Sequence, residues 1–364
     1  MKFGKNDANR LAGFHPAPHK AGLGSGGTTA LEEGRPGDCC FVVPGAVWKE
    51  ERRRFGGICS KLLLVDTNLT RRSALALFAT TLVRAAERLP ANKNVKWALG
   101  SNLWSSYFKE LPFSDILDVM KDTGFIGLRV TQFPGILDKY KITSEELRKE
   151  MDKRGLHAIT ISFNAQAQDA AQRPKMIADA KQAMGFLKEF GANMLVVFSP
   201  NRRALTDESF KVMCESYNQL GEVCGEMGFR AGLHNHLGQM VQNQDEIDKC
   251  MAMTDPKLFW YAPDTAHLYM AGCDSAANLG KYRSRLMMMD YKDAKKPPAT
   301  GSFIQSIYDL GDGDVDFPAC HKVLKSMSYK GWICVDLDTA RKGPRASYER
   351  SGAYVVNKLE PIYL

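Results

Sequence analysis

Three signals are missing from this 364-residue chain, and each absence excludes a class of protein. No apolar stretch reaches the roughly 18 to 20 uninterrupted residues that a membrane-spanning helix needs, so we expect no stable membrane insertion. The nine cysteines form no CxxC pair, which argues against a disulfide framework and against a cysteine zinc site. The formal charge of +8 is not arranged as a basic stripe with interleaved aromatic residues, so we expect no nucleic-acid partner.

The first 65 residues show no sustained hydrophobic periodicity. The sequence of residues 15–38 is HPAPHKAGLGSGGTTALEEGRPGD, a segment rich in glycine, proline, alanine and charged residues. This composition is typical of a disordered segment. We therefore expect residues 1–65 to be a disordered leader, or to precede a true translation start near Val65.

The next segment, residues 66–91, resembles a twin-arginine export signal in part. Arg71 and Arg72 precede a short apolar stretch at residues 74–83, and small residues follow near Ala85 and Ala91. The match is incomplete, because alanine stands at position 74, where the usual motif has a large apolar residue. We expect export to the periplasm by this route. The alternative is an amphipathic helix that packs on the domain of a cytoplasmic protein.

From residue 94 to residue 364 the chain repeats a pattern of short apolar run, polar turn and amphipathic helix. The runs are apolar on both faces, as in buried parallel strands. They are VKWALG, GFIGLRVT, GLHAITISF, NMLVVFS, FRAGLH, LFWYAPD, RLMMMDY and GWICVDLD. Eight such units match the length of a (β/α)8 TIM barrel. A doubly wound sheet is the alternative, but no glycine-rich phosphate-binding turn follows the first run.

Helix boundaries between these runs are also marked. Thr143 and Glu146 have the spacing of a capping box, and Asp316 precedes a proline in the first turn of a helix. Several helices are predicted to end at a glycine just before the next strand, at Gly124, Gly155, Gly191 and Gly228.

Titratable side chains gather at the ends of the last four predicted strands. In strand order they are His234 and His236, then Asp264 and His267, then Asp290 and Lys292, then Asp336 and Asp338. Each has an ordinary alternative, such as a helix cap for Asp264 or a solvated surface pair for Lys292 and Asp293. The strand ends of a barrel meet at one mouth, where several acidic and imidazole groups would repel one another without a cation. We therefore predict a divalent metal site.

The same region resembles the sugar phosphate isomerase/epimerase family of xylose isomerase-like barrels. The stretches that carry the resemblance are LHNHLGQMVQNQDEID, PDTAHLYMAGCD, MDYKDAK and DLGDGDVDFPACHKVLKSMSYKGWICVDLD. The resemblance extends from Val95 to the C-terminus. The HNH motif at residues 234–236 is most similar to the inosose dehydratase-like branch of the family. The histidines of HNH follow a buried strand, so we do not expect the nuclease motif of the same letters.

The resemblance implies four metal ligands, His234, Asp264, Asp290 and Asp336. Two of them depart from the family pattern, because Asp290 stands where histidine is usual and Asp336 stands where glutamate is usual. One imidazole and three carboxylates form a hard, anionic donor set. We therefore expect Mn²⁺, with Mg²⁺ or Co²⁺ as alternatives.

The chemistry implied by the resemblance is proton abstraction next to a carbonyl, through an enediolate that the metal stabilises. We assign Asp336 as ligand and base, His236 or His267 as the second acid or base, and Lys292 as an electrostatic clamp. The first prediction is a metal-dependent isomerase or epimerase acting on a keto-sugar or related polyol. An inosose dehydratase-like lyase is the first alternative, and a non-catalytic carbohydrate-binding barrel is the second. The expected partner is a small carbohydrate or polyol, and a homo-oligomer is left open.

Overall fold

The computed structural model describes Leu89, residues 94–296 and residues 302–363. The predictions for residues 1–65 and, apart from Leu89, for residues 66–91 lie outside the described residues. Among the helices in the described residues, none is both long enough and apolar enough to cross a membrane.

Eight parallel strands form the sheet, in the order β6-β5-β4-β3-β2-β1-β10-β7. Isolated parallel bridges from Tyr261 to Leu286 and from Asp264 to Asp290 join the two ends, so the sheet closes into a barrel. Each of the eight predicted runs contains one strand, and the predicted TIM barrel is confirmed. The strands are β1 (Val95–Gly100), β2 (Gly127–Val130), β3 (His157–Asn164), β4 (Met194–Phe198), β5 (Arg230–His234), β6 (Phe259–Tyr261), β7 (Met289–Tyr291) and β10 (Gly331–Val335).

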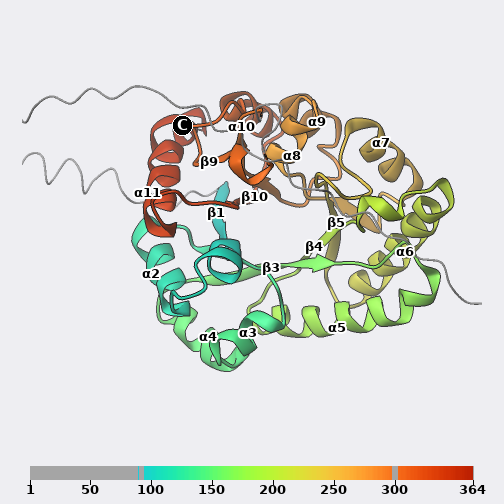
Figure 1. Ribbon diagram of the computed structural model, residues 1–364, viewed down its shortest axis with the longest axis horizontal. Helices are drawn as coiled ribbons and strands as arrows, with labels where there is room; N and C mark the ends of the chain where they lie inside the picture. Colours follow the sequence, from blue (N-terminus) through green and yellow to red (C-terminus); the bar gives the residue numbers. More distant parts are fainter. Residues whose placement is uncertain (1–88, 90–93, 297–301, 364) are drawn as a thin grey trace, which may run out of the picture. The chain divides into compact units, whose positions relative to one another are not determined.

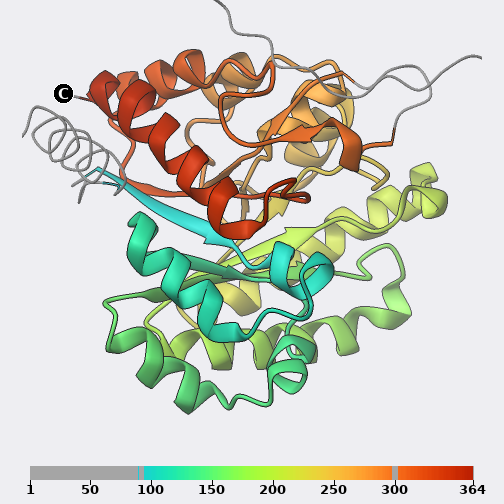
Figure 2. The same cartoon turned by 60° about the vertical axis from the view of Figure 1, so that its left-hand side comes forward.

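Helices cover the outside of this barrel (Figures 1 and 2). They are α2 (Phe113–Thr123), α3 (Gly135–Tyr140), α4 (Ser144–Asp152), α5 (Arg173–Glu189), α6 (Asp207–Glu226), α7 (Gln244–Met253), α8 (Thr265–Met270), α9 (Ser275–Lys281), α10 (Phe317–Ser326), α11 (Pro344–Tyr354) and α12 (Glu360–Tyr363). A short antiparallel hairpin, β8 (Asp293–Ala294) with β9 (Ile307–Tyr308), follows β7.

The predicted helix boundaries are confirmed in detail. The Thr143 side chain accepts from the Glu146 backbone N–H at the start of α4, and the reciprocal bond is also present. Asp316 caps α10 by accepting from the backbone N–H of Ala319. The four glycines predicted at helix ends all have positive φ, which other residues rarely adopt, with values of 87° at Gly124, 68° at Gly155, 69° at Gly191 and 80° at Gly228.

The barrel interior explains why the strand-end side chains converge. A buried cluster inside the sheet includes Ala98, Val196 and Cys334, from three different strands. Side chains two residues apart on a strand point to the same face. The residues two positions after these three, Gly100, Phe198 and Asp336, therefore also point inward, one layer nearer the C-terminal end of the barrel. Residues at the same level of the neighbouring strands complete this layer. That layer comprises Gly100, Arg129, Phe198, His234, Asp264, Asp290 and Asp336.

Candidate active site

The four side chains predicted as metal ligands lie together at the C-terminal end of the barrel. His234, Asp264, Asp290 and Asp336 have exposed fractions of 1%, 0%, 1% and 2%. His234 Nε2 is 3.8 Å from an Asp264 oxygen, and His234 Nδ1 is 3.2 Å from an Asp290 oxygen. Buried carboxylates at such spacing require compensating positive charge.

Arg129, which the sequence analysis did not single out, supplies part of that charge. It lies in β2 with 2% of its surface exposed. Its guanidinium forms an ion pair with Asp290 through Nη1 and another with Asp336 through Nη2, the latter at 2.6 Å. One feature of the sequence could have predicted this role: Arg129 is the single charged residue in the apolar strand GLRV. An arginine is rarely buried unless it is paired, so its presence in a buried strand indicates acidic partners nearby.

Lys292 supplies the second buried positive charge. Its Nζ lies 2.6 Å from Asp336, 2.9 Å from Asp338 and 3.2 Å from Asp264. Asp338 also accepts a 2.6 Å hydrogen bond from the Asn102 side chain. The alternative of a solvated surface pair is wrong, because Lys292 is 2% exposed and Asp293 is 0% exposed.

The two cations set the protonation of the carboxylates. Burial opposes ionisation of Asp336, but Arg129 and Lys292 outweigh it and hold the pKa of Asp336 below its usual range. Burial raises the pKa of Asp290 to about 6, against the opposing effect of Arg129. Burial also raises the pKa of Asp264, although Lys292 opposes this. Asp336 is therefore the carboxylate held most firmly in its charged form.

The histidines of the site are neutral, and their contacts fix where the proton sits. His236 Nδ1 lies 2.7 Å from the Leu237 carbonyl, which only accepts, so Nδ1 carries the proton and Nε2 has a free lone pair. The Leu237 backbone N–H donates to His267 Nδ1 at 3.3 Å, so the proton of that ring is on Nε2. Burial lowers the pKa of His236 to about 4 and lowers that of His267 well below its usual value.

A cavity of about 180 Å³ opens at the barrel mouth beside these groups. The predicted catalytic residues Asp336, His236 and Lys292 line it, whereas His267 and the predicted ligands His234, Asp264 and Asp290 do not. The remaining lining is mostly neutral and polar: Asn102, Thr131, Gln132, Ser162, Asn164, Phe198, with Arg129 and Asp338. The cavity therefore suits a small molecule that carries several hydroxyl groups.

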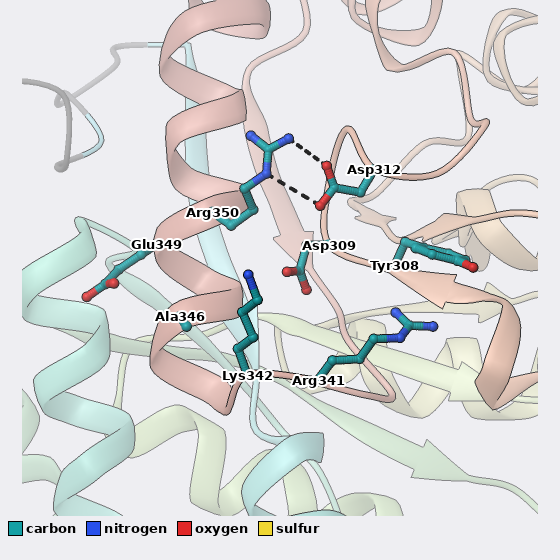
Figure 3. A pocket seen from close by; sticks show the side chains of 8 residues that line it. All are labelled: Tyr308, Asp309, Asp312, Arg341, Lys342, Ala346, Glu349 and Arg350. Atoms are coloured by element: carbon teal, nitrogen blue, oxygen red, sulfur yellow. Dashed lines mark hydrogen bonds and ion pairs between the residues drawn. The ribbon is translucent and has the colours of Figure 1, made fainter. Parts of the chain in front are cut away.

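A larger hollow of about 510 Å³, between α11 and the loop after β9, is a poorer candidate (Figure 3). Three of its charged groups already have partners: Arg350 binds Asp312 at 2.5 Å, and Arg341 lies 4.4 Å from the Tyr308 ring. Arg341 also donates to the Ile307 carbonyl at 3.0 Å. No strongly shifted buried acid or base faces this hollow, so we place the site at the barrel mouth.

By spacing alone, the buried groups suggest a divalent metal. The ligand atoms of His234, Asp264 and His267 lie within 4.8 Å of one another, and so do those of Asp264, Asp290 and Asp336. The contacts do not fit an ion in either group. In the first, His267 Nδ1 accepts the Leu237 N–H, so an ion at Nε2 would have to displace the proton of the ring and this hydrogen bond. In the second, Arg129 and Lys292 already contact the carboxylates that would hold the ion.

Comparison with known proteins gives the family. The model of the xylose isomerase-like TIM barrel family matches residues 117–355. An inosose dehydratase of Clostridium perfringens is 28% identical over 279 residues, covering 68% of this chain and 91% of that protein.

Two solved structures share the fold. A sugar phosphate isomerase/epimerase of Parabacteroides distasonis superposes with a TM-score of 0.58 at 20% identity, covering 75% of this chain and 96% of its own. The IOLI protein, solved with a zinc atom, has a TM-score of 0.58 at 13% identity, covering 73% and 96%. The family model matches well over half of the chain, and this chain therefore belongs to the xylose isomerase-like TIM barrel family.

Proposed function

We propose that this chain is an enzyme that removes the proton next to the carbonyl group of a small polyhydroxylated ketone. The observation that carries the proposal is the cavity itself, in which an unprotonated His236 Nε2 lies in the same hollow as two fixed cations, Arg129 and Lys292. Because its pKa is about 4, the His236 ring is unprotonated at neutral pH and can accept a proton there, as a weaker base than an ordinary imidazole. The cations stabilise the negative charge that develops on the carbonyl oxygen.

The roles follow from the contacts. His236 takes the proton at Nε2. Lys292 stays charged, because the carboxylates around it raise its pKa well above the usual value against the effect of burial, so it acts as a clamp and not as an acid. Asp336 is a poor base, since Arg129 and Lys292 each bind one of its oxygens at 2.6 Å. His236 is left as the base that the cavity offers, in place of the Asp336 base first expected.

We propose loss of water as the outcome of this step. The inosose dehydratases that the chain resembles support it. One base is also sufficient, because the proton that His236 has taken can be returned to the departing β-hydroxyl, which leaves as water. Isomerisation or epimerisation is the second candidate, supported by the shared enediolate chemistry and by the name of the Parabacteroides neighbour. No step of this proposal involves the divalent ion predicted from the sequence, which was Mn²⁺ before Mg²⁺ or Co²⁺.

The test is incubation of the full chain with a panel of inososes and keto-sugars in D₂O, once with Mn²⁺ and once with EDTA. Product 18 mass units lighter, plus any deuterium gained, indicates the lyase. Deuterium incorporation without loss of water indicates the isomerase or epimerase. Binding of a sugar without either change would leave the non-catalytic barrel as the correct description and would refute the proposal.

A further inference from the structure

Two side chains of the protein already lie where the predicted metal ligands converge. Arg129 reaches Asp290 and Asp336 from β2, and Lys292 reaches Asp264 and Asp336 from the segment after β7. All five groups are at least nine-tenths buried. Buried charges of opposite sign at this distance interact strongly and are costly to separate.

The carboxylate oxygens can be accounted for one by one. Both oxygens of Asp336 are bound, Oδ1 to Arg129 and Oδ2 to Lys292. Asp264 uses Oδ1 to cap α8 through the backbone N–H groups of Ala266 and His267, and its Oδ2 faces Lys292 at 3.2 Å. Asp290 Oδ2 binds Arg129, which leaves Oδ1 without a hydrogen-bond partner. Asp264 Oδ2 and Asp336 Oδ1 also accept no hydrogen bond, but each lies within 3.2 Å of Lys292 or Arg129. The one carboxylate oxygen of Asp264, Asp290 and Asp336 with neither a hydrogen bond nor a cation beside it is Asp290 Oδ1, so a divalent ion bound by all three carboxylates would have to displace the two cations.

We propose that Arg129 and Lys292 take the place of a divalent metal in this site, so that the substrate's oxygens bind to these two cations directly. The proposal rests on the proposed function for the identity of those oxygens. Both cations line the cavity, whereas His234, Asp264 and Asp290 do not. The electrophilic surface that a bound ketone meets is thus a guanidinium and an ammonium group.

The local sequence accommodates the guanidinium. The two positions that depart from the family pattern, Asp290 and Asp336, are the two carboxylates that Arg129 binds. Gly100 at the end of β1 also leaves space for this ion pair. A Cβ at this position would collide with the Asp336 carboxylate and lie 3.5 Å from Arg129 Nη2. An aspartate is smaller than the histidine usual at position 290 and than the glutamate usual at position 336, so these two side chains and the missing Cβ of Gly100 leave the room that the arginine fills.

The test is metal analysis and thermal unfolding of the full chain, purified from cells grown with added Mn²⁺. We expect well under about 0.1 equivalent of any divalent transition metal per chain, and a Tm that is the same in Mn²⁺ and in EDTA, because a ligand that does not bind the native state cannot stabilise it. About one equivalent of metal, with a Tm that falls in EDTA, would overturn the inference.

Substitution of the arginine gives a second readout. Arg129→Met frees Asp290 and Asp336, so we expect this variant to gain a Tm response to Mn²⁺ that Arg129→Lys does not show. Arg154→Met is the matched control, since Arg154 also pairs with two carboxylates, Asp118 and Glu150, but does not line the cavity. If Arg129→Met does not fold, the wild-type measurement alone decides. Neither measurement uses a substrate, so the inference can fail while the proposed reaction stands, and the reverse also holds.

Discussion

At the scale of single residues, His236 has the clearest chemical role in this account. It is neutral, its Nδ1 donates to the Leu237 carbonyl, and its ring packs against that of His267 at a tilt of 39°, with centroids 3.7 Å apart. These contacts fix the ring with its lone pair available. The neighbouring ring of His267 is a donor that faces the Asp264 side of the cluster and not the cavity.

We therefore predict that His236→Gln lowers the rate of deuterium exchange or water loss by about 10²- to 10⁴-fold, the usual contribution of a general base. KM should change little, because the glutamine can still form hydrogen bonds. The control is His321→Gln, which replaces a buried histidine that does not line the cavity. Equal rates for the two variants would remove His236 from the mechanism.

A second prediction at this scale concerns Gly100. Gly100→Ala should destabilise the protein by about 1–3 kcal/mol, because the new methyl group displaces the Asp336 carboxylate. Gly185→Ala is the control: it lies inside α5 with no atom within 4 Å of the added Cβ, so we expect a gain of about 0.5–1 kcal/mol. Unfolding in urea measures the free energy of unfolding of the two variants and of the wild type. A Gly100→Ala variant as stable as the wild type would show that the inner layer is looser than described.

At the scale of secondary-structure elements, the loop after β9 is organised by one buried carboxylate. Asp293 accepts from the backbone N–H groups of Gly311 and Gly313 through one oxygen, and from those of Ala294 and Val315 through the other. A side chain at Gly313 would collide with it. Asp293, which follows the cavity-lining Lys292, thus has a structural role: it holds the backbone of this loop in place.

Asp293→Asn replaces one acceptor oxygen with a donor, so two of these four hydrogen bonds are lost. We predict a loss of about 2–4 kcal/mol in the free energy of unfolding, with faster hydrogen exchange at the amides of residues 311–315. Asp316→Asn is the control, since asparagine caps a helix as well as aspartate and its stability should stay within about 0.5 kcal/mol of the wild type. Similar losses in both variants would contradict the special role of Asp293.

The elements also show what the sequence could and could not predict. All eight strands were predictable, because buried parallel strands are apolar on both faces, and helix ends were marked by caps and glycines. The convergence of His234, Asp264, Asp290 and Asp336 followed from barrel geometry. Arg129 was not predicted, since its charge partners lie 161 residues or more away in sequence and only the closed sheet brings them together.

The proton positions on the two histidine rings were equally unpredictable. They depend on whether an imidazole nitrogen faces the N–H or the C=O of one residue, Leu237. No periodicity or motif reports such a contact. For the same reason the sequence favoured Asp336 as base, whereas the contacts favour His236.

At the scale of the whole molecule, buried neutral histidines make stability depend on pH. Burial lowers the pKa of His321 to about 4, and its ring stacks on Trp97 with centroids 5.8 Å apart. The unfolded chain binds a proton there below pH 6.5, whereas the native state does not until about pH 4. The contribution of this histidine is therefore complete above pH 6.5 and is lost as the pH falls towards 4.

We predict that the wild type loses about 1–2 kcal/mol more stability than His321→Gln when the pH is lowered from about 7.5 to about 5. The variant is less stable at the higher pH, because it loses the contact between His321 and the Tyr291 hydroxyl, 3.1 Å apart. Denaturant unfolding at the two pH values gives the comparison. Parallel losses in the two proteins would mean that folding does not lower the pKa of His321.

The most direct test of the central claim is a crystal structure of the protein grown in Mn²⁺, with anomalous diffraction data collected to locate the ion. The account predicts the Arg129 guanidinium between Asp290 and Asp336, the Lys292 ammonium against Asp264 and Asp336, and no anomalous peak among them. A manganese ion bound by His234, Asp264, Asp290 and Asp336, with Arg129 turned away, would contradict it.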